Sequence, residues 1–324
     1  MISLDHFWLL AIALVLDAII GDPDLIWRRL PHPVAIIGGL IGLLDRTLNS
    51  DALSARWRKI AGVFAIIIAA VLAGLVGYGL ELFFRSFAFG WIGTAVIASV
   101  LLAGRSLYEH VAAVADAFAE GLPAARAAVS RIVGRDPGSL DQPHVCRAAI
   151  ESAAENMSDG VVAPALWFLA LGLPGLFAYK AINTADSMIG HLTSRYEDFG
   201  WAAARLDDLV NLPASRIAGA LIALSASFSG GSIARAFRVM LAEAPRHRSP
   251  NAGWPEAAMA TVLGLALAGP RRYAGIIVSD PFVNAAGRRD ANPTDIRRAL
   301  RVYFAANAIF FVLVTAIAAC VLWL

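Results

Sequence analysis

The sequence predicts an all-α, polytopic integral membrane protein with about four full spans, plus short or re-entrant helical segments and cytoplasmic amphipathic helices. Of its 324 residues, 58% are hydrophobic and 16% are charged. The mean hydropathy of +0.65 is too high for a soluble domain of this length. Several apolar runs are long enough to cross a bilayer, and the basic residues are distributed unevenly between them.

The longest apolar runs predict the full spans. At about 1.5 Å per helical residue, a run of roughly 20 residues crosses the hydrocarbon layer. The run at the N-terminus lacks a basic start and contains Asp5 and Asp17, so we interpret it as a span and not as a signal peptide. The predicted spans cover residues 2–20, 60–84, 87–104 and 302–324.

The basic residues predict the orientation. Arginines are frequent before residue 60 and after residue 104, whereas only Arg85 lies between the two spans of the predicted hairpin. The positive-inside rule therefore places both basic segments in the cytoplasm and both termini outside. Cys146 and Cys320 then lie far apart, which predicts neither a disulfide nor a cysteine metal site.

The remaining segments give weaker signals. Residues 105–156 are predicted to form cytoplasmic amphipathic helices, with a new helix starting near Asp141. The runs 161–178, 217–230 and 257–269 are short or interrupted, and the polar segments between them are all basic. We therefore expect re-entrant or partly embedded segments that return to the cytoplasm. Without internal repeats or a clear linker, residues 1–324 are treated as one domain.

A first polar cluster, ENMSDG at residues 155–160, precedes a helix expected to start near Val161. A helix cap needs one side-chain oxygen. This segment supplies four oxygen-bearing side chains, which suits a magnesium ion shared with phosphates. The four are Glu155, Asn156, Ser158 and Asp159.

A second cluster, KAINTADSMIG at residues 180–190, follows the apolar run. Lys180, Asn183 and Ser187 share one helical face, and Asp186 lies on the neighbouring face. A lysine that snorkels to the interface explains Lys180 alone, whereas a triphosphate site explains the whole group. If the run from Val161 returns to the cytoplasmic side, the two clusters form a single pocket.

A third cluster places Asp207 and Asp208 shortly before Asn211, with Arg205 alongside. It is either a solvated helix start with ordinary ion pairs or a site for a second metal or an amine substrate. The loops at residues 21–34 and 249–260 are typical turns, although His32, held between two prolines, is a candidate proton acceptor. No Walker loop, HExxH or GxSxG motif occurs in the sequence.

Together these blocks resemble the adenosylcobinamide-phosphate synthase family of cobalamin biosynthesis (CbiB/CobD type). The resemblance extends over most of the chain in the same order, and only the last block departs, where WPEAAMATVLG replaces a more glycine-rich continuation. The matching blocks are LDAIIGDPDLIWRRLPHPVAIIGGLI, AAIESAAENMSDGVVAPALWFLALGLPGLFAYKAINTADSMIGH, GWAAARLDDLVNLPASRI and SPNAGWPEAAMA.

The resemblance implies an amide-bond-forming ligase of the inner membrane. Its substrates are expected to be adenosylcobyric acid and (R)-1-aminopropan-2-ol O-phosphate, or a similar amino-alcohol phosphate, with ATP as cosubstrate and Mg²⁺ as cofactor. The product is adenosylcobinamide phosphate. The expected partners are the lipid bilayer and either a second copy of the chain or other membrane enzymes of cobalamin assembly; no nucleic acid is expected.

Chemistry then suggests roles for the polar residues. An acyl donor must be activated, a phosphoryl charge stabilised and an amine proton accepted. The candidate catalytic residues are Lys180, Asp186, Asp207 and Asp208. The candidate metal ligands are Glu155, Asp159 and Asp186. The candidate residues for binding nucleotide and substrate are Asn156, Ser158, Asn183, Ser187, Arg205, Asn211 and His32, with Arg205 a candidate for the amino-alcohol phosphate.

Two alternative functions stay open from the residues alone. A membrane transferase acting on a lipid headgroup or prenyl diphosphate would work without ATP. A transporter would use the interrupted run 161–178 as a midplane site with two-sided access. The tryptophans beside the polar blocks either stack on a corrin ring or anchor the chain at the membrane interface; they are Trp167, Trp201 and Trp254.

Overall fold

The fold is described in a computed structural model of the chain, which covers residues 4–23, 27–133, 138, 140–273, 276–278 and 280–322. The chain is 77% helical. Strands are confined, in these residues, to two short antiparallel pairs: β1 (Leu267–Ala268) with β4 (Phe282–Val283), and β2 (Arg271–Tyr273) with β3 (Ile276–Val278). The prediction of an all-α protein is confirmed.

The chain divides into two compact units. Unit 1 comprises Met1–Ala103, Ala163–Asn211 and Val314–Leu324, and unit 2 comprises Gly104–Val162 and Leu212–Leu313. Each unit is built from segments that are distant in the sequence. The boundaries between them fall at helix ends or within helices, so the single domain expected over residues 1–324 stays a prediction.

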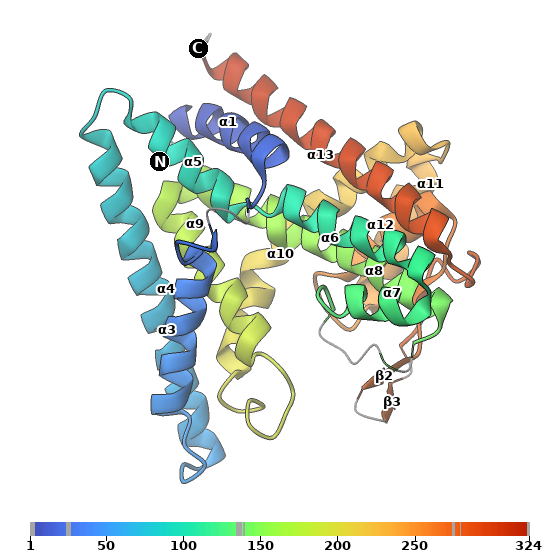
Figure 1. The fold of residues 1–324 in the computed structure, drawn as a ribbon, viewed down its shortest axis with the longest axis horizontal. Helices are drawn as coiled ribbons and strands as arrows, with labels where there is room; N and C mark the ends of the chain where they lie inside the picture. The colour runs from blue at the N-terminus through green and yellow to red at the C-terminus, as the bar shows by residue number, and fades with distance from the viewer. Residues whose placement is uncertain are drawn as a thin grey trace. The chain divides into compact units, whose positions relative to one another are not determined.

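Among the described residues, unit 1 is formed mainly by five helices. In Figure 1, α4 (cyan) lies along α9 (yellow-green), and α3 packs against both. The α1 and α5 helices contact each other and also contact α9. The bounds are α1 (Leu4–Ile20), α3 (Pro33–Leu48), α4 (Ala55–Arg85), α5 (Gly90–Leu101) and α9 (Ala163–Ile189); the first half of α10 (Trp201–Leu224) completes the unit.

The α4 helix packs through a stripe of small residues. These residues recur every three or four positions and are buried: Gly62, Ala65, Ala69, Ala73 and Gly77. Small side chains let two helix backbones approach closely, which is how helices associate when lipid surrounds them. Large side chains elsewhere on the helix are exposed, among them Phe64, Leu75 and Phe83. The helix thus presents small residues to the protein and large apolar residues outward.

The α9 helix is broken at Gly172, whose φ of 69° and ψ of −152° are non-helical and favour glycine. Pro174 follows two residues later and cannot donate a backbone hydrogen bond. The break is capped by two side chains from other helices. The Nδ1 atom of His6 lies 3.2 Å from the carbonyl oxygen of Leu169, and Glu81 accepts a 3.0 Å hydrogen bond from the amide of Leu173.

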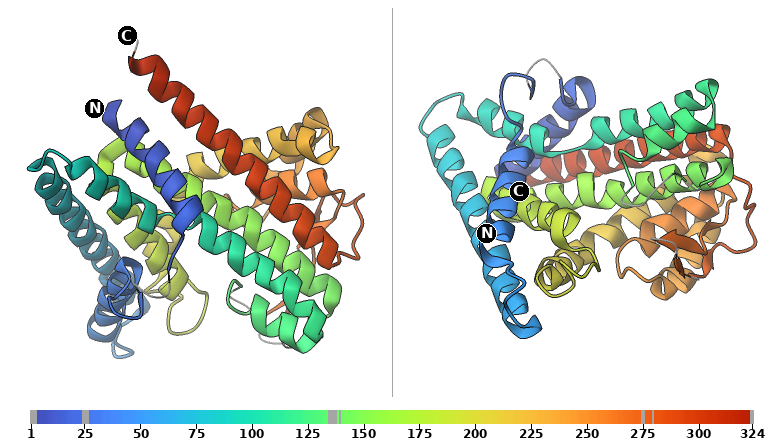
Figure 2. Two further views of the ribbon diagram at one scale, coloured as in Figure 1. Left: turned by 45° about the horizontal axis from the view of Figure 1, so that its top comes forward. Right: turned by 60° about the horizontal axis from the view of Figure 1, so that its bottom comes forward.

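Unit 2 is arranged around α8, a helix buried along almost its whole length. The α6, α7 and α12 helices pack against it, and α6 lies beside α8 in Figure 1 and in the left view of Figure 2. The bounds are α6 (Gly104–Ala117), η1 (Phe118–Glu120), α7 (Leu122–Val129), α8 (Gln142–Met157), η2 (Ser158–Val162), η3 (Ser225–Ser229), α11 (Ile233–Glu243), η4 (Ala244–Arg246), α12 (Gly253–Leu263) and α13 (Pro293–Leu322), of which the residues from Val314 on belong to unit 1.

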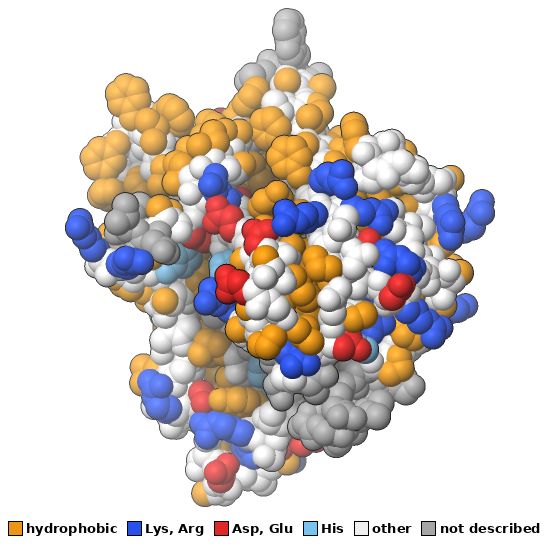
Figure 3. Space-filling model, turned by 45° about the vertical axis from the view of Figure 1, so that its right-hand side comes forward, with side chains coloured by type: hydrophobic (Ala, Val, Ile, Leu, Met, Phe, Trp, Pro, Cys, Tyr) orange, Lys and Arg blue, Asp and Glu red, His pale blue; other side chains and the backbone are white. Residues whose placement is uncertain are grey.

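Five helical stretches within the described residues are long and apolar enough to cross a membrane: Ala55–Arg85, Gly90–Glu120, Gln142–Ile189, Trp201–Ser229 and Pro293–Cys320. Figure 3 shows broad areas of exposed hydrophobic side chains on the face it draws. The chain is therefore a multi-pass membrane protein. The first predicted span forms α1, which has 17 residues. The runs 161–178 and 217–230 belong to longer helices than expected, because helix continues through the polar clusters beside them.

Candidate functional site

Asp207 lies at the centre of a polar cluster in unit 1. Its side chain is on α10 and is only 8% exposed. Asn183 of α9 donates a 3.3 Å hydrogen bond to it, and Asn211 also interacts with it. Asp186 and Asp208 lie close enough to Asp207 to interact with it electrostatically. The structure thus brings the second and third predicted clusters together, around three carboxylates.

Hydrogen bonds within and between α9 and α10 orient this cluster. The hydroxyls of Thr184 and Ser187 donate to carbonyls one turn earlier in α9, at 2.6 and 3.0 Å. Such bonds are common for hydroxyl side chains in helices. Tyr179 donates a 3.0 Å hydrogen bond to the side-chain oxygen of Asn211, and both groups are buried. The amide of Asn211 therefore has a fixed direction beside Asp207.

Two cations accompany the carboxylates. Lys180 is buried and lies one helical turn before Asn183. Arg205 pairs with Asp208 at 3.1 Å, but its side chain is 64% exposed. An exposed pair of this kind contributes little to stability. Of the two cations, the buried Lys180 is the one suited to meet a desolvated anion.

The residues fit a magnesium ion that arrives with a nucleotide better than a resident metal. No group of three or more His, Cys, Asp or Glu side chains in the described parts of the chain converges as a metal site. Magnesium bound through phosphates takes only one or two carboxylates from the protein and keeps several waters. Of the predicted metal ligands, Asp186 belongs to this cluster.

The ENMSDG cluster lies in unit 2 and has an unexpected backbone. A helix start near Val161 was predicted, but α8 continues through a π-helical turn at Ser158–Val162 and on into α9. Such turns occur frequently at functional sites. The side chain of Asn156 donates to the carbonyl and hydroxyl oxygens of Ser152, at 2.9 and 3.1 Å. Ser158 is 1% exposed, and its hydroxyl has no partner among the described residues.

The predicted metal ligands are divided between the two units. Glu155 and Asp159 belong to unit 2, and Asp186 belongs to unit 1. Glu155 is exposed and Asp159 is half-buried. The single pocket expected from the two clusters that flank residues 161–178 therefore stays a prediction.

His32 has a local structural role. It caps the N-terminus of α3, where its Nδ1 atom accepts a 3.2 Å hydrogen bond from the amide of Val34. Its Nε2 atom lies 3.5 Å from Asp22, and the ring of Trp27 packs edge-on against it. Residues 24–26 of this loop lie outside the described residues. The role of His32 as a proton acceptor stays a prediction.

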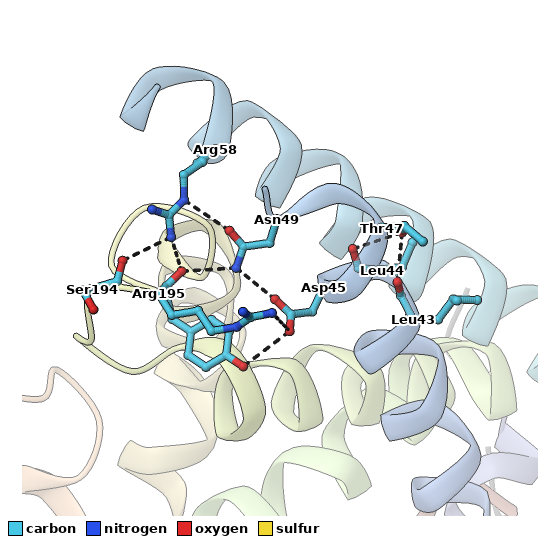
Figure 4. Close-up of polar contacts among 9 residues, drawn as sticks. Leu43, Leu44, Asp45, Thr47, Asn49, Arg58, Ser194 and Arg195 are labelled. Carbon is cyan, nitrogen blue, oxygen red and sulfur yellow. Dashed lines mark hydrogen bonds and ion pairs between the residues drawn. The ribbon is translucent and has the colours of Figure 1, made fainter. Parts of the chain in front are cut away.

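A group of residues that the sequence did not reveal holds the loop between α9 and α10 (Figure 4). We call Asp45, Asn49, Arg58 and Arg195 the Asp45 clamp. Asp45 pairs with Arg195 at 2.8 Å, and this hydrogen bond raises the pKa of Arg195. Asn49 donates to Asp45 at 2.9 Å and to the Arg195 carbonyl at 3.2 Å. Arg58 donates to Asn49, to the Ser194 carbonyl and to the Arg195 carbonyl.

The clamp acts on the connection between the two helices of the cluster. Asp186 lies near the end of α9, Asp207 lies near the start of α10, and the clamped loop joins them. No sequence signal pointed to the clamp, because its members are single polar residues separated by up to 150 positions. The tertiary fold brings them together.

We expect Asp45→Ala to loosen this loop. Asn49 is buried, and leaving its amide without the Asp45 acceptor costs about 1–2 kcal/mol of unfolding free energy. Hydrogen exchange of residues 190–200, followed by mass spectrometry, should become faster. Asp51→Ala, at an exposed position of the turn between α3 and α4, is the matched control. Equal exchange rates in the two variants would show that the clamp does not hold the loop.

Comparisons with known proteins agree in pointing to one family. A sequence model of the family described as CobD/Cbib protein matches residues 10–303. Several proteins named cobalamin biosynthesis protein CobD align over nearly their whole length. The protein from Sinorhizobium fredii is 51% identical over 308 residues, covering 94% of each chain. The Rhizobium meliloti protein is 49% identical, covering 95% of each, and the Rhodobacter capsulatus protein is 46% identical, covering 93% of each. No solved structure matches the chain.

Proposed function

The chain belongs to the CobD/Cbib protein family and so to cobalamin biosynthesis, and we propose that it catalyses an ATP-dependent amide ligation. The proposed acyl substrate is adenosylcobyric acid. The proposed amine is (R)-1-aminopropan-2-ol O-phosphate or a similar amino-alcohol phosphate, and the product is adenosylcobinamide phosphate.

The cluster around Asp207 is the observation that carries this proposal. An amino alcohol enters mainly as an ammonium ion, which must lose a proton before its nitrogen can attack. Three neighbouring carboxylates attract the ammonium, and Asp207 or Asp208 can accept its proton. Asn183 donates a hydrogen bond to Asp207, and the amide of Asn211 interacts with it electrostatically. The cluster thus supports the binding and activation of an amine.

The chemistry balances in two steps. A carboxylate oxygen of the corrinoid attacks the terminal phosphorus of ATP, which forms an acyl phosphate and releases ADP. The amine nitrogen then attacks the acyl carbon, which forms the amide and releases inorganic phosphate. Activation is needed because a free carboxylate has no leaving group. Lys180 is proposed to stabilise the transferring phosphoryl group as a fixed positive charge.

The remaining predicted residues are proposed to hold the nucleotide. In unit 1 these are Asn183, Asp186 and Ser187, and in unit 2 they are Asn156, Ser158, Glu155 and Asp159. The buried hydroxyl of Ser158 supports a ligand there, because a buried polar atom is normally hydrogen-bonded. When bound, magnesium would neutralise charge on the phosphates, with Asp186, Glu155 and Asp159 as its proposed ligands.

The membrane setting leads to two further proposals. The basic segments before residue 60 and after residue 104 support a cytoplasmic site in the cell inner membrane. A homo-oligomer or other membrane enzymes of cobalamin assembly are the proposed protein partners. The substrates would then reach the site from the compartment that contains ATP.

The proposal is tested with the purified full-length protein in lipid nanodiscs. Adenosylcobyric acid, aminopropanol phosphate, Mg²⁺ and ATP are supplied together, and the product is identified by its mass. One ADP and one inorganic phosphate should appear for each amide formed, and omission of ATP should abolish the product. Product without ATP would instead favour the transferase, and flux of unchanged corrinoid across sealed vesicles would favour the transporter.

A further inference from the structure

A cavity of about 690 Å³ lies within unit 1 and is lined by residues of α1, the end of α4 and the start of α5. Its volume falls in the range of roughly 300–1,000 Å³ that is typical of small-molecule sites. Four Trp or Phe rings line it together with Asp5, His6, Glu81 and Arg85. Among the described residues, none of those proposed for the ligation lines this cavity.

His6 indicates that the occupant donates a hydrogen bond. Its side chain is only 7% exposed, and its Nδ1 atom lies 3.2 Å from the carbonyl oxygen of Leu169. A carbonyl can only accept, so Nδ1 carries the hydrogen of the neutral ring and Nε2 is an acceptor. In the part of the chain that the structure describes, Nε2 has no hydrogen-bond partner. Because buried polar groups are normally hydrogen-bonded, a donor such as a primary ammonium group fits this position.

The charged lining residues suit a ligand that carries both signs. Glu81 is already engaged, since it pairs with Arg85 at 2.6 Å and accepts a 3.0 Å hydrogen bond from the amide of Leu173. Asp5 is exposed and forms no ion pair with any described residue, so its carboxylate is available to an ammonium group. Arg85 reaches Glu81 through Nη2, and its other nitrogens bond to no described residue. These nitrogens are available to a phosphate.

The position of the cavity points to a lipid as its occupant. It lies where the candidate span Ala55–Arg85 ends and the candidate span Gly90–Glu120 begins. Two of its aromatic residues, Phe87 and Trp91, are 55% and 48% exposed. Aromatic rings are enriched where spans leave the hydrocarbon layer, and their faces attract ammonium groups. The cavity therefore lies at the depth of the lipid headgroups.

Exposed apolar side chains continue from the cavity along α1 and α5, which lie side by side in Figure 1. On α1, Ile12 lines the cavity, and Val15 and Ile19 follow at helical spacing with exposed fractions of 40% and 67%. On α5, Ile92 and Val96 are 46% and 42% exposed. The acyl chains of a lipid whose headgroup occupies the cavity would cover this surface, whereas a water-soluble zwitterion would not.

We propose that this cavity binds the headgroup of a zwitterionic phospholipid with a primary ammonium group, such as phosphatidylethanolamine. Asp5 and the Nε2 atom of His6 accept hydrogen bonds from the ammonium, and Arg85 binds the phosphate. The distribution of basic residues predicts that this end of α4 faces the outer leaflet. The proposed ligation site is expected on the cytoplasmic side, so this inference does not depend on the proposed function.

Competition between lipids tests this proposal. The purified full-length protein in detergent is mixed with equal amounts of phosphatidylethanolamine, phosphatidylcholine and phosphatidylglycerol that carry identical acyl chains, and bound lipid is measured by native mass spectrometry. Phosphatidylethanolamine should be retained best, because the ammonium of phosphatidylcholine cannot donate a hydrogen bond and phosphatidylglycerol has no ammonium. Asp5→Asn should weaken its binding roughly 10-fold, as expected for loss of one charged contact.

Two further variants locate the contacts. Arg85→Gln should weaken phosphatidylethanolamine and phosphatidylglycerol alike, because both carry the phosphate. Asp51→Asn, at an exposed position of the turn between α3 and α4, should bind normally. Asp5 and Arg85 are exposed, so both variants should fold, which size-exclusion chromatography checks.

Three results would overturn the proposal. Equal retention of the three lipids by the wild type would show that the cavity does not select this headgroup. Unchanged binding of phosphatidylethanolamine in Asp5→Asn would place the lipid elsewhere on the protein. Displacement of the lipid by an equal concentration of glycerophosphoethanolamine, which has the same headgroup without acyl chains, would assign the cavity to a soluble zwitterion.

Discussion

Asp207→Asn lowers product formation in the ligation assay by about 10²- to 10⁴-fold, the range expected for loss of a general base. Asparagine has nearly the same shape and keeps an oxygen that can accept the hydrogen bond from Asn183. It cannot accept the proton of the amine. The variant should therefore insert into the membrane and fold like the wild type, which size-exclusion chromatography and circular dichroism would check.

Two further aspartates sharpen the test of Asp207. Asp208→Asn should have a smaller effect if Asp207 is the base, because Asp208 is half-buried and paired with Arg205. A larger effect of Asp208→Asn would assign the base to that residue. Asp116→Asn, at an exposed position of unit 2, is the control and should leave activity unchanged. Normal turnover in both Asp207→Asn and Asp208→Asn would rule out this cluster as the site of proton transfer.

Gly77→Val destabilises the protein by about 3 kcal/mol, the upper part of the usual range for overpacking. Even a Cβ atom at Gly77 would lie 2.5 Å from the carbonyl oxygen of Leu173. That oxygen belongs to the backbone, which cannot move aside as a flexible side chain does. Leu173 also follows the break in α9 and donates to Glu81, so its displacement should disturb the capping of the break.

The same helix provides a matched control. Gly79 lies two residues along α4, and a Cβ atom there would have no atom within 4 Å. Gly79→Val changes helix propensity as Gly77→Val does but adds no clash. The two variants are compared by their free energies of unfolding, measured in a denaturant titration of the detergent-solubilised protein. Equal losses of stability would mean that the contact between α4 and α9 is looser than the structure indicates.

The spans and several helix starts could be predicted because they depend on neighbouring residues. Residues 60–84 lie within α4 and residues 302–322 within α13 because a continuous apolar run favours lipid wherever the rest of the chain lies. The helix expected near Asp141 is α8, where Asp141 accepts a 3.0 Å hydrogen bond from the amide of His144. Residues 158–160 could not be predicted as a π-helical turn, because their polar side chains equally suit a cap.

The sequence predicted which residues belong to the candidate site but not which of them are in contact. The sequence pointed to Asn183, Asp207 and Asn211 from their density, and the structure adds that both amides interact with Asp207. Ser215 and Asn251 are buried and hydrogen-bonded to each other at 3.1 Å, but no sequence signal paired them, because isolated residues on separate segments form no pattern. The Asp45 clamp escaped prediction for the same reason.

The composition and order of residues were sufficient to predict the helical class and the membrane setting, since helix formation and transfer into lipid are properties of contiguous stretches. The order of the polar blocks was sufficient to predict the family. Only the folded chain decided which polar groups meet, such as Asp207 with its two amides and the 190–200 loop with α3. Such contacts join distant positions and depend on burial, where an uncompensated charge or an extra methyl group carries a cost that no local pattern records.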